Sequence, residues 1–246
     1  MIKLIFAIFL FLYSQPSFAA TSLTPQEKFD LGQKYLKRGN YPKALEQFNQ
    51  IRNFYRDDPL AIEAELAIAD LYFKKNEWDQ ARVYYDEFER RFPNHPKIDY
   101  VSFQLGLCYY KKAPKTHQRD QRWTEQAIYH WRDFETKYPK STYREEVAKK
   151  FSECRNRLAE KELYIAKFYQ NRSAWEAVKR RTDFLIKNHP ESDVLSEAYE
   201  LSAISNFNLG KSEESEKALN KLKELKPQKA GEIKADLTPK ESPKEK

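Results

Sequence analysis

The sequence repeats itself, and this self-similarity constrains the fold more than any other feature. The stretch LGQKYLKRGNYPKALEQF (31–48) aligns without gaps with IADLYFKKNEWDQARVYY (68–85). The alignment places Gly32 on Ala69, Tyr35 on Tyr72, Tyr41 on Trp78, Ala44 on Ala81, and Phe48 on Tyr85. The same frame continues three more times, through Gly106, Tyr109, Ala127, Trp131 and Pro139, then Ala166, Tyr169, Trp175, Val178 and Pro190, then Ala203, Leu219, Leu222 and Pro227. A fixed repeat of this kind indicates a stacked architecture.

Each unit has the same physical plan. A small residue allows two helices to approach closely, an aromatic residue follows one turn later, and a proline ends the unit. This plan resembles the tetratricopeptide repeat, so the predicted fold is all-α, an α-α superhelix of five helix-turn-helix repeats with a concave groove. Only five glycines occur in the chain, too few for a Gly-rich phosphate loop or a turn-rich β-sandwich.

The repeats suggest a division of the chain into four parts. Residues 1–19 are expected to be a signal peptide, and residues 20–140 to hold repeats one to three with the concave groove. Residues 141–227 are expected to hold a long helix, unbroken by proline or glycine, and repeats four and five. Residues 228–246 are rich in Lys and Glu and lack aromatic residues, which predicts a disordered tail.

The first residues have the pattern of a targeting segment. The apolar run LIFAIFLFLY (4–13) is too short to span a bilayer, and Ser17 and Ala19 provide the small residues that precede cleavage, expected after Ala19. The only cysteines are Cys108 and Cys154, so no thiol near this junction is available for lipid attachment. In an oxidising compartment a disulfide between them is permitted, but buried small hydrophobic residues are the default interpretation.

The first helices of repeats one to three are expected to line the groove. An extended segment with alternating aromatic side chains would fit it, because every second side chain could enter a successive pocket. Packing between neighbouring helices is the alternative for any single residue. The candidate groove residues are Phe29, Leu36, Leu66, Asp70, Phe73, Phe103, Leu107 and Tyr110.

Other functions find little support in the residues. No serine or cysteine nucleophile is matched with a base, and neither His95 nor His189 has a carboxylate or cysteine at ligand spacing, so we expect no enzyme, no metal and no cofactor. The formal charge is +7, but basic and acidic residues alternate, which argues against nucleic acid. A basic insert carries Lys111, Lys112, Lys115, Arg119 and Arg122, and it is either a solvated loop or a partner contact.

Three stretches are more specific than the general repeat. They are KYLKRGNYPKALEQF (34–48), RFPNHPKIDYVSFQLGL (91–107) and the segment from KYPKSTY to VKRR (137–181), which includes RLAEKELYIAKFY. These stretches resemble the BamD family, the tetratricopeptide component of the machinery that inserts β-barrel proteins into bacterial outer membranes. The resemblance covers residues 24 to 227 and includes the number of repeats.

The resemblance implies a periplasmic adaptor without chemistry of its own, at the inner face of the outer membrane. It would bind a BamA-like barrel subunit, with Arg181 as the arginine at that contact, and unfolded outer-membrane β-barrel proteins in the groove. An exposed helix arginine is the alternative for Arg181. The family is ordinarily lipidated, whereas this chain lacks a cysteine after its signal sequence, so membrane association is expected through partners rather than a lipid anchor.

Two other classes stay open. A periplasmic tetratricopeptide adaptor of a cell-division or Tol-Pal type complex would share the repeat, but it would lack the PNHPKIDY corner and would usually carry an N-terminal coiled coil. An enzyme would need a convergent polar cluster in a closed pocket, which stacking the helices would bring into view.

Overall fold

The computed structural model describes residues 23–237, and these residues form helices and turns without any strand. The signal peptide predicted for residues 1–19 lies outside the described residues. The chain divides into two compact units, with the division between Ala64 and Glu65. The boundary predicted between residues 140 and 141 falls inside the second unit and stays a prediction about how the repeats group.

The first unit is a helix hairpin of α1 (Pro25–Lys37) and α2 (Tyr41–Phe54), followed by the start of α3 (Pro59–Lys74). Thr24 and Glu27 form a capping box that satisfies two backbone N–H groups at the start of α1. Gly39 turns the chain between the helices with a φ of 73°. A Cβ atom on Gly32 would lie 2.6 Å from Phe48 Cε1, which confirms the predicted close approach at this small residue.

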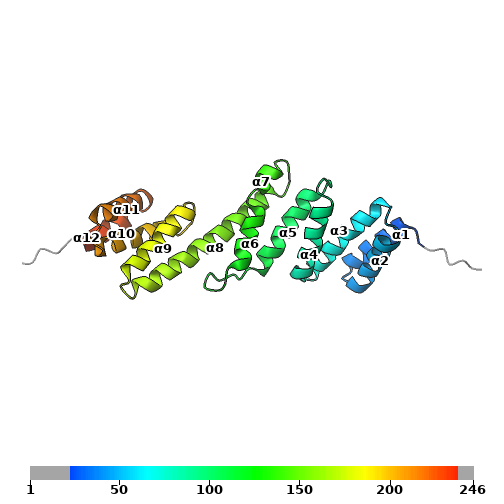
Figure 1. Ribbon diagram of the computed structural model, residues 1–246, viewed down its shortest axis with the longest axis horizontal. Helices are drawn as coiled ribbons and strands as arrows, with labels where there is room; N and C mark the ends of the chain where they lie inside the picture. Colours follow the sequence, from blue (N-terminus) through cyan, green and yellow to red (C-terminus); the bar gives the residue numbers. More distant parts are fainter. Residues whose placement is uncertain (1–22, 238–246) are drawn as a thin grey trace, which may run out of the picture. The chain divides into compact units, whose positions relative to one another are not determined.

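The second unit continues the pattern of antiparallel helices (Figure 1). After the end of α3, its helices are α4 (Trp78–Arg91), α5 (Ile98–Lys112), α6 (Arg122–Trp131), α7 (Phe134–Lys137), α8 (Arg144–Gln170), α9 (Trp175–Asn188), α10 (Leu195–Asn208), α11 (Ser212–Leu225) and α12 (Pro227–Leu237). Consecutive helices pack against each other, α4 on α5, α5 on α6, α8 on α9, and α10 on both α9 and α11. The prediction of an all-α fold built from tetratricopeptide-type hairpins is confirmed.

A close approach in the second unit lies at Gly106 of α5. A Cβ atom there would lie 2.0 Å from Nε1 of Trp131, which is itself buried. Gly106 is therefore the residue that allows the indole to lie directly against the backbone of α5. Both residues occupy repeat positions identified in the sequence.

Helix α8 is the unbroken helix predicted in residues 141–172. Its N-terminal half contributes Val147 and Cys154 to an apolar cluster with Phe103, Leu107 and Trp131. Its C-terminal half contributes residues to a second cluster, which contains Ala159, Leu163, Ala166, Val178, Leu185, Ala198 and Leu201. One helix thus belongs to two successive parts of the core. Cys108 and Cys154 are buried free thiols, in agreement with their default interpretation.

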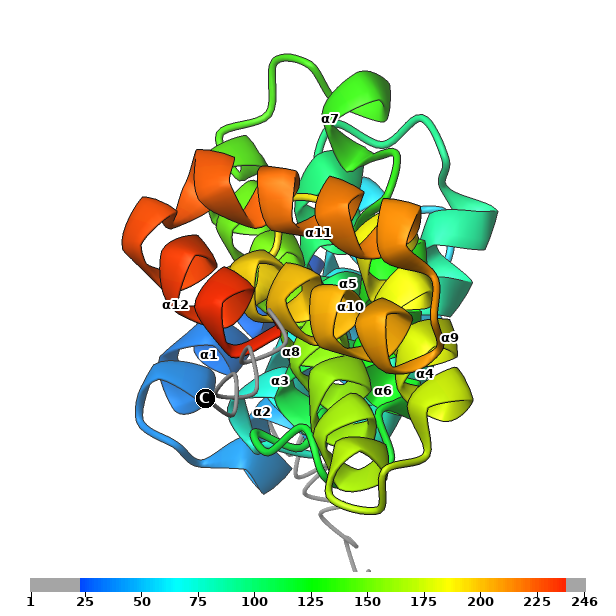
Figure 2. The ribbon, with the colours of Figure 1, turned by 90° about the vertical axis from the view of Figure 1, so that its left-hand side faces the viewer.

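The C-terminal end corrects one prediction. Residues 228–237 were expected to be disordered, but Pro227 starts the helix α12, because proline fits the first turn of a helix. Ala230 and Ile233 are buried against the apolar cluster of Leu219 and Leu222, so α12 covers the end of the repeat stack. Figure 2 shows α12 beside α10 and α11. Residues 238–246 lie outside the described part of the chain.

Candidate functional site

One candidate site is the surface formed by α8 and α9, which we call the α8–α9 surface. It is a recess of about 300 Å³ lined by Tyr169, Ala177, Arg180, Arg181 and Phe184. The helical spacing of Ala177, Arg181 and Phe184 places all three on one side of α9. The Phe184 side chain is 49% exposed, and Phe168 of α8, which precedes Tyr169 in the chain, is exposed as well. An aromatic recess bordered by arginines is typical of protein–protein contacts.

Arg181 has a partner that the sequence did not identify. Its Nη1 donates a hydrogen bond of 2.9 Å to Oε2 of Glu162 on α8. The Arg181 side chain is 42% exposed, whereas that of Glu162 is only 14% exposed. The carboxylate therefore fixes the guanidinium on its protein-facing side, and the rest of the guanidinium is open to a partner.

The predicted groove takes residues from both compact units, and each unit is described separately. In the first unit, Leu36 is buried, and the ring of Phe29 lies 5.6 Å from that of Phe48. In the second unit, Leu66, Phe103 and Leu107 are buried. Packing between helices, the alternative that the sequence left open, accounts for the burial of these leucines and of Phe103. A role in peptide binding stays a prediction for all of the groove residues.

The polar groove residue, Asp70, is held by two tyrosines. The hydroxyl of Tyr85 donates to Asp70 Oδ1 at 2.6 Å, and that of Tyr100 donates to the same oxygen at 2.7 Å. Burial raises the pKa of Asp70, although both hydroxyls act in the opposite direction. Leu66, Asp70, Lys97, Tyr100 and Tyr143 contribute to a recess of about 430 Å³ that stays open to solvent.

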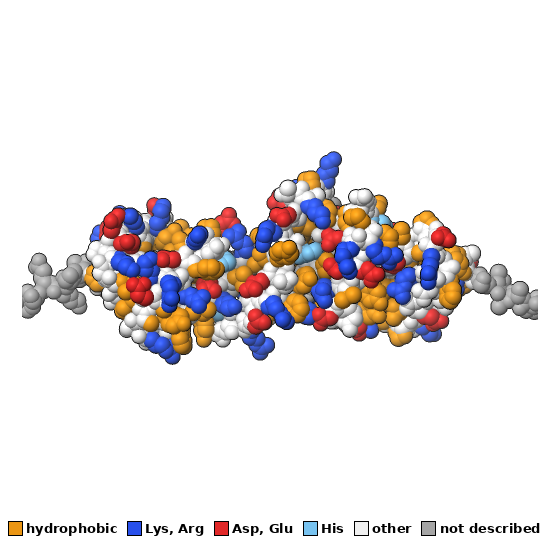
Figure 3. Space-filling model, viewed as in Figure 1, with side chains coloured by type: hydrophobic (Ala, Val, Ile, Leu, Met, Phe, Trp, Pro, Cys, Tyr) orange, Lys and Arg blue, Asp and Glu red, His pale blue; other side chains and the backbone are white. Residues whose placement is uncertain are grey.

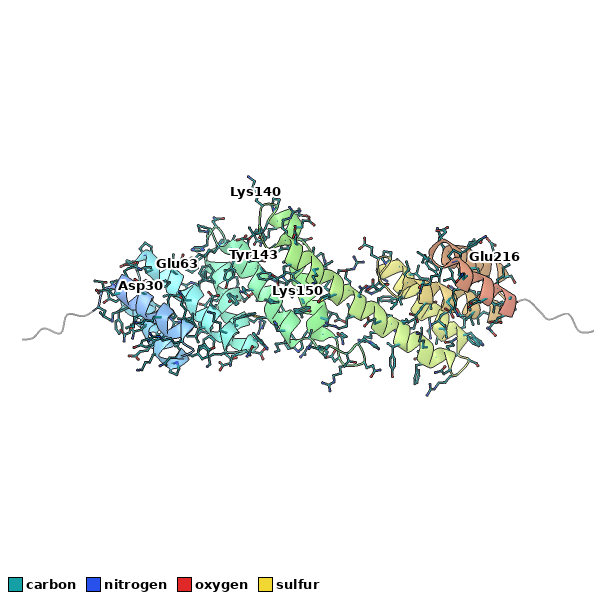
Figure 4. All side chains as sticks on the ribbon, turned by 180° about the vertical axis from the view of Figure 1, so that it is seen from behind. Asp30, Glu63, Lys140, Tyr143, Lys150 and Glu216 are labelled. Atoms are coloured by element: carbon teal, nitrogen blue, oxygen red, sulfur yellow. The ribbon has the colours of Figure 1, made fainter. Side chains whose placement is uncertain are left out.

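In the second unit, Phe73 and Tyr110 are the partly exposed aromatic members of the groove set. The ring of Phe73 packs edge-on against Trp78 at 4.9 Å. The hydroxyl of Tyr110 donates to Oε2 of Glu153 at 2.5 Å, and this hydrogen bond together with burial raises the pKa of Tyr110 to about 12. Lys150, labelled in Figure 4, places its ammonium group 4.7 Å from the Tyr110 ring centroid. Tyr110 is therefore fixed in place by α8.

The basic insert is an ordered loop. The buried Gln121 amide donates hydrogen bonds to the carbonyls of Thr116 at 2.8 Å and Arg119 at 3.1 Å, while Thr124 donates to Gln121 Oε1 at 2.6 Å. Lys112 is ion-paired with Asp79 and lies 3.6 Å from the Trp123 ring centroid. The other cationic residues of the insert are exposed, and they are Lys111, Lys115, Arg119 and Arg122.

Charge elsewhere on the surface is mixed. Figure 3 shows Lys and Arg interspersed with Asp and Glu over the face that it presents. Among residues 23–237, no helix combines the length and the apolar character needed to cross a membrane.

Comparison with known proteins decides the family. The model of the YfiO family, described as an outer membrane lipoprotein, matches residues 21–222. The chain belongs to this family. Its membership confirms the resemblance to BamD that the sequence motifs indicated.

Curated relatives of this YfiO family member are named outer membrane protein assembly factor BamD. The relative from Helicobacter pylori is 33% identical over 144 residues, which cover 57% of this chain and 64% of that protein. The Vibrio cholerae relative is 25% identical over 195 residues, covering 76% and 81%. The Xylella fastidiosa 9a5c relative is 28% identical over 176 residues, covering 67% of this chain but only 59% of the relative. The chain thus spans less than two thirds of the length of the Helicobacter and Xylella relatives.

Proposed function

We propose that the chain is a non-catalytic adaptor of the outer-membrane β-barrel assembly machinery, located on the periplasmic side of the outer membrane. In this role it binds the periplasmic part of a BamA-like barrel subunit through the α8–α9 surface and receives unfolded barrel proteins in the groove. The observation that carries the proposal is Arg181, a partly exposed guanidinium that is held by Glu162 in the same recess as the exposed ring of Phe184.

This surface has the composition of a binding hot spot. Arginine and aromatic residues contribute most to protein interfaces when they lie at the centre of a contact that excludes water. A partner carboxylate would approach the open side of the Arg181 guanidinium, which has further N–H donors beyond the one given to Glu162. A carboxylate on the barrel subunit is therefore the chemistry that we expect opposite Arg181.

The test is charge reversal with an internal control. Arg181→Glu should weaken binding to the purified periplasmic domains of the barrel subunit by about tenfold or more, because repulsion replaces attraction. The same change also places two carboxylates together at Glu162. The double variant Arg181→Glu with Glu162→Arg restores the ion pair between α8 and α9. It moves the arginine from α9 to α8, away from the position expected to contact the partner.

The double variant separates the two effects. Binding that stays weak in the double variant, with native helix content by circular dichroism, supports a direct contact. Wild-type binding by either variant would overturn the proposal. Lys187→Glu is the matched control, since Lys187 is an exposed residue of the same helix and does not line the recess.

For substrates, we propose that the recess around Asp70 and Tyr100, with Phe73 and Tyr110, takes an extended segment of an unfolded barrel protein. Pockets along a helical groove fit an extended chain, because its side chains alternate in direction. The variant Phe73→Ser with Tyr110→Ser should weaken binding of a peptide from the last strand of a barrel protein. Unchanged peptide affinity in a folded double variant would show that the groove lies elsewhere.

A further inference from the structure

A second cleft lies across the N-terminal half of α8 and has no part in the proposed function. It has a volume of about 230 Å³ and is formed by residues of α6, α7, α8 and the turn that precedes α10. On α8, its lining residues Arg144, Ala148, Phe151 and Arg155 recur at helical spacing, so they share one face of the helix. Lys150 and Glu153, which hold Tyr110, do not line this cleft.

The interior of the cleft is largely apolar. Val147, Ala148 and Phe151 of α8 line it, together with Trp131 and Phe134. Val147, Trp131 and Phe134 are buried members of one core cluster, so this wall is fixed by the fold. A cleft of this size is smaller than the usual pocket for a small-molecule ligand and fits a single large side chain.

Hydrogen bonds hold both sides of the cleft in place. On one side, Arg144 is ion-paired with Glu135 of α7 and donates to the Pro139 carbonyl at 2.9 Å. On the other side, Arg155 donates to the Asn188 carbonyl at 3.3 Å. Asn156 donates to Asp193 at 2.7 Å and ties the same turn to α8. The cleft is therefore preformed rather than a gap between mobile segments.

Three polar atoms at the cleft have no hydrogen-bond partner. They are Arg144 Nε, His189 Nδ1 and Ser192 Oγ, and each belongs to a residue that lines the cleft. His189 is only 9% exposed. A buried polar group without a partner costs free energy, so such a cluster requires an explanation. Each of these atoms is buried from solvent, so an acceptor oxygen of a ligand reaches Arg144 Nε or Ser192 Oγ after a small turn of that side chain toward the cleft.

The charges around the cleft also favour an anionic ligand. It is lined by Arg132, Arg144 and Arg155 against Glu135 and Glu191. The glutamates point more toward solvent than their partners, since the Arg155 side chain is 29% exposed while that of Glu191 is 82% exposed. Arg144 and Arg155 thus lie deeper than the glutamates paired with them, so a carboxylate held inside the cleft lies closer to donors than to those acids.

We propose that this cleft binds a protein segment that inserts one aromatic side chain next to an acidic residue of the same segment. The aromatic ring lies on Val147, Ala148 and Phe151. The adjacent carboxylate accepts hydrogen bonds from Arg144 and Ser192. This contact is separate from the α8–α9 surface and adds a second point at which a partner protein is held.

The proposal can be tested with capped dipeptides and nuclear magnetic resonance of the full chain. The probe acetyl-Phe-Glu-amide should cause saturable shifts in the Trp131 indole and Ser192 amide signals at millimolar concentrations. Acetyl-Phe-Gln-amide should bind about tenfold more weakly, because its neutral side chain loses the charge-assisted hydrogen bonds. Acetyl-Ala-Glu-amide should cause no saturable shift. Equal responses to all three probes, or no response to the first, would overturn the proposal.

Two matched variants locate the probe. Ala148 is an exposed residue of α8, so Ala148→Phe fills the cleft without entering the core and should abolish the shifts. Lys149→Phe adds the same ring to the next exposed position, which does not line the cleft, and should retain them. Binding of acetyl-Phe-Glu-amide by Ala148→Phe with wild-type affinity would contradict the assignment. Ala148→Phe should bind the barrel subunit like the wild type, so the outcome does not depend on Arg181.

Discussion

At Gly106, the absence of a side chain lets the Trp131 indole lie against the backbone of α5. Neither the indole nor the α5 backbone can move easily, because Trp131 is buried and α5 is packed on both α4 and α6. The same role falls to Gly32 opposite Phe48 in the first unit, where the aromatic ring is again fully buried. At these two repeat positions, a small residue is thus required for steric reasons, because a Cβ atom would overlap the aromatic ring.

The requirement predicts a large effect of one methyl group. Gly106→Ala should lower the free energy of unfolding by about 1–3 kcal/mol or more, since the Cβ overlaps the indole and the core must shift. Gly231→Ala is the matched control, because nothing lies within 4 Å of the position that its Cβ would take in α12. It should stabilise the protein by about 0.5–1 kcal/mol through helix propensity. Urea unfolding of both variants measures the difference, and equal stabilities would contradict the steric argument.

The two thiols give a second prediction for single residues. Burial raises the pKa of Cys108 to about 12 and that of Cys154 to about 11. Because the thiolate is the reactive form, neither should react with a thiol reagent at neutral pH in the folded protein. Both should be labelled after denaturation, as measured by mass spectrometry. Rapid labelling of the native chain would show that the helices around them open.

Among the helices, α12 is one that the sequence did not predict. It takes the place that a further repeat would occupy and covers Leu219 and Leu222 with Ala230 and Ile233. Without such a cover, the last hairpin would expose its apolar face to water. This explains why a segment with few apolar residues is nevertheless helical.

Removal of α12 should therefore destabilise the C-terminal hairpin. A chain ending at Lys226 should melt at a lower temperature and bind a dye that reports exposed apolar surface, because the cluster around Leu222 loses its cover. A chain ending at Leu237 keeps α12 and is the control. Equal melting temperatures for the two truncations would show that α12 adds nothing to the fold.

The sequence pattern predicts some of the helices and close contacts and misses others. The pattern located α8 because no proline or glycine interrupts residues 144–170, and it located Gly106 because small residues recur in one frame. It missed α12, whose apolar residues Ala230, Ile233 and Leu237 are sparse among charges. It could not separate buried Leu66 from partly exposed Phe73, because a helix covered on two sides has apolar residues on both.

The candidate sites were harder to predict than the fold for a physical reason. Arg181 was singled out through its family resemblance, but Glu162 lies nineteen residues away and becomes its partner only when α8 and α9 pair. The cleft joins Arg144 and Ser192 from segments that are far apart in the chain. Such contacts depend on how hairpins stack, and no local periodicity records them.

At the scale of the whole molecule, the described chain falls into two compact units. The three apolar clusters centred on Trp131, Leu185 and Leu222 take all their residues from the second unit. In repeat proteins, each repeat contacts its neighbours only, so the loss of a terminal repeat leaves the others intact.

Because these three clusters need no residue of the first hairpin, we predict that the second unit folds without it. A fragment beginning at Asp58, just before α3, should lose only the helical signal of α1 and α2, as measured by circular dichroism. It should also retain binding to the barrel subunit, because Arg181 and Glu162 are both present. A fragment that is unfolded, or folded but unable to bind, would show that the first hairpin is needed.

The shared helix α8 also bears on which changes of length the chain can tolerate. Each residue inserted into a helix advances the remainder of that helix by about 1.5 Å and rotates it by about 100°. An insertion between Cys154 and Ala159 would turn Glu162 away from Arg181 while leaving Val147 in place, so the two halves of the core could not both form. The loop between α5 and α6 is held by the bonds of Gln121 and by the contact of His117 with Glu160 on α8, and it has no helical register to preserve. Insertions and deletions should therefore accumulate in that loop across the family, while the residue count of α8 between these two contact points stays constant.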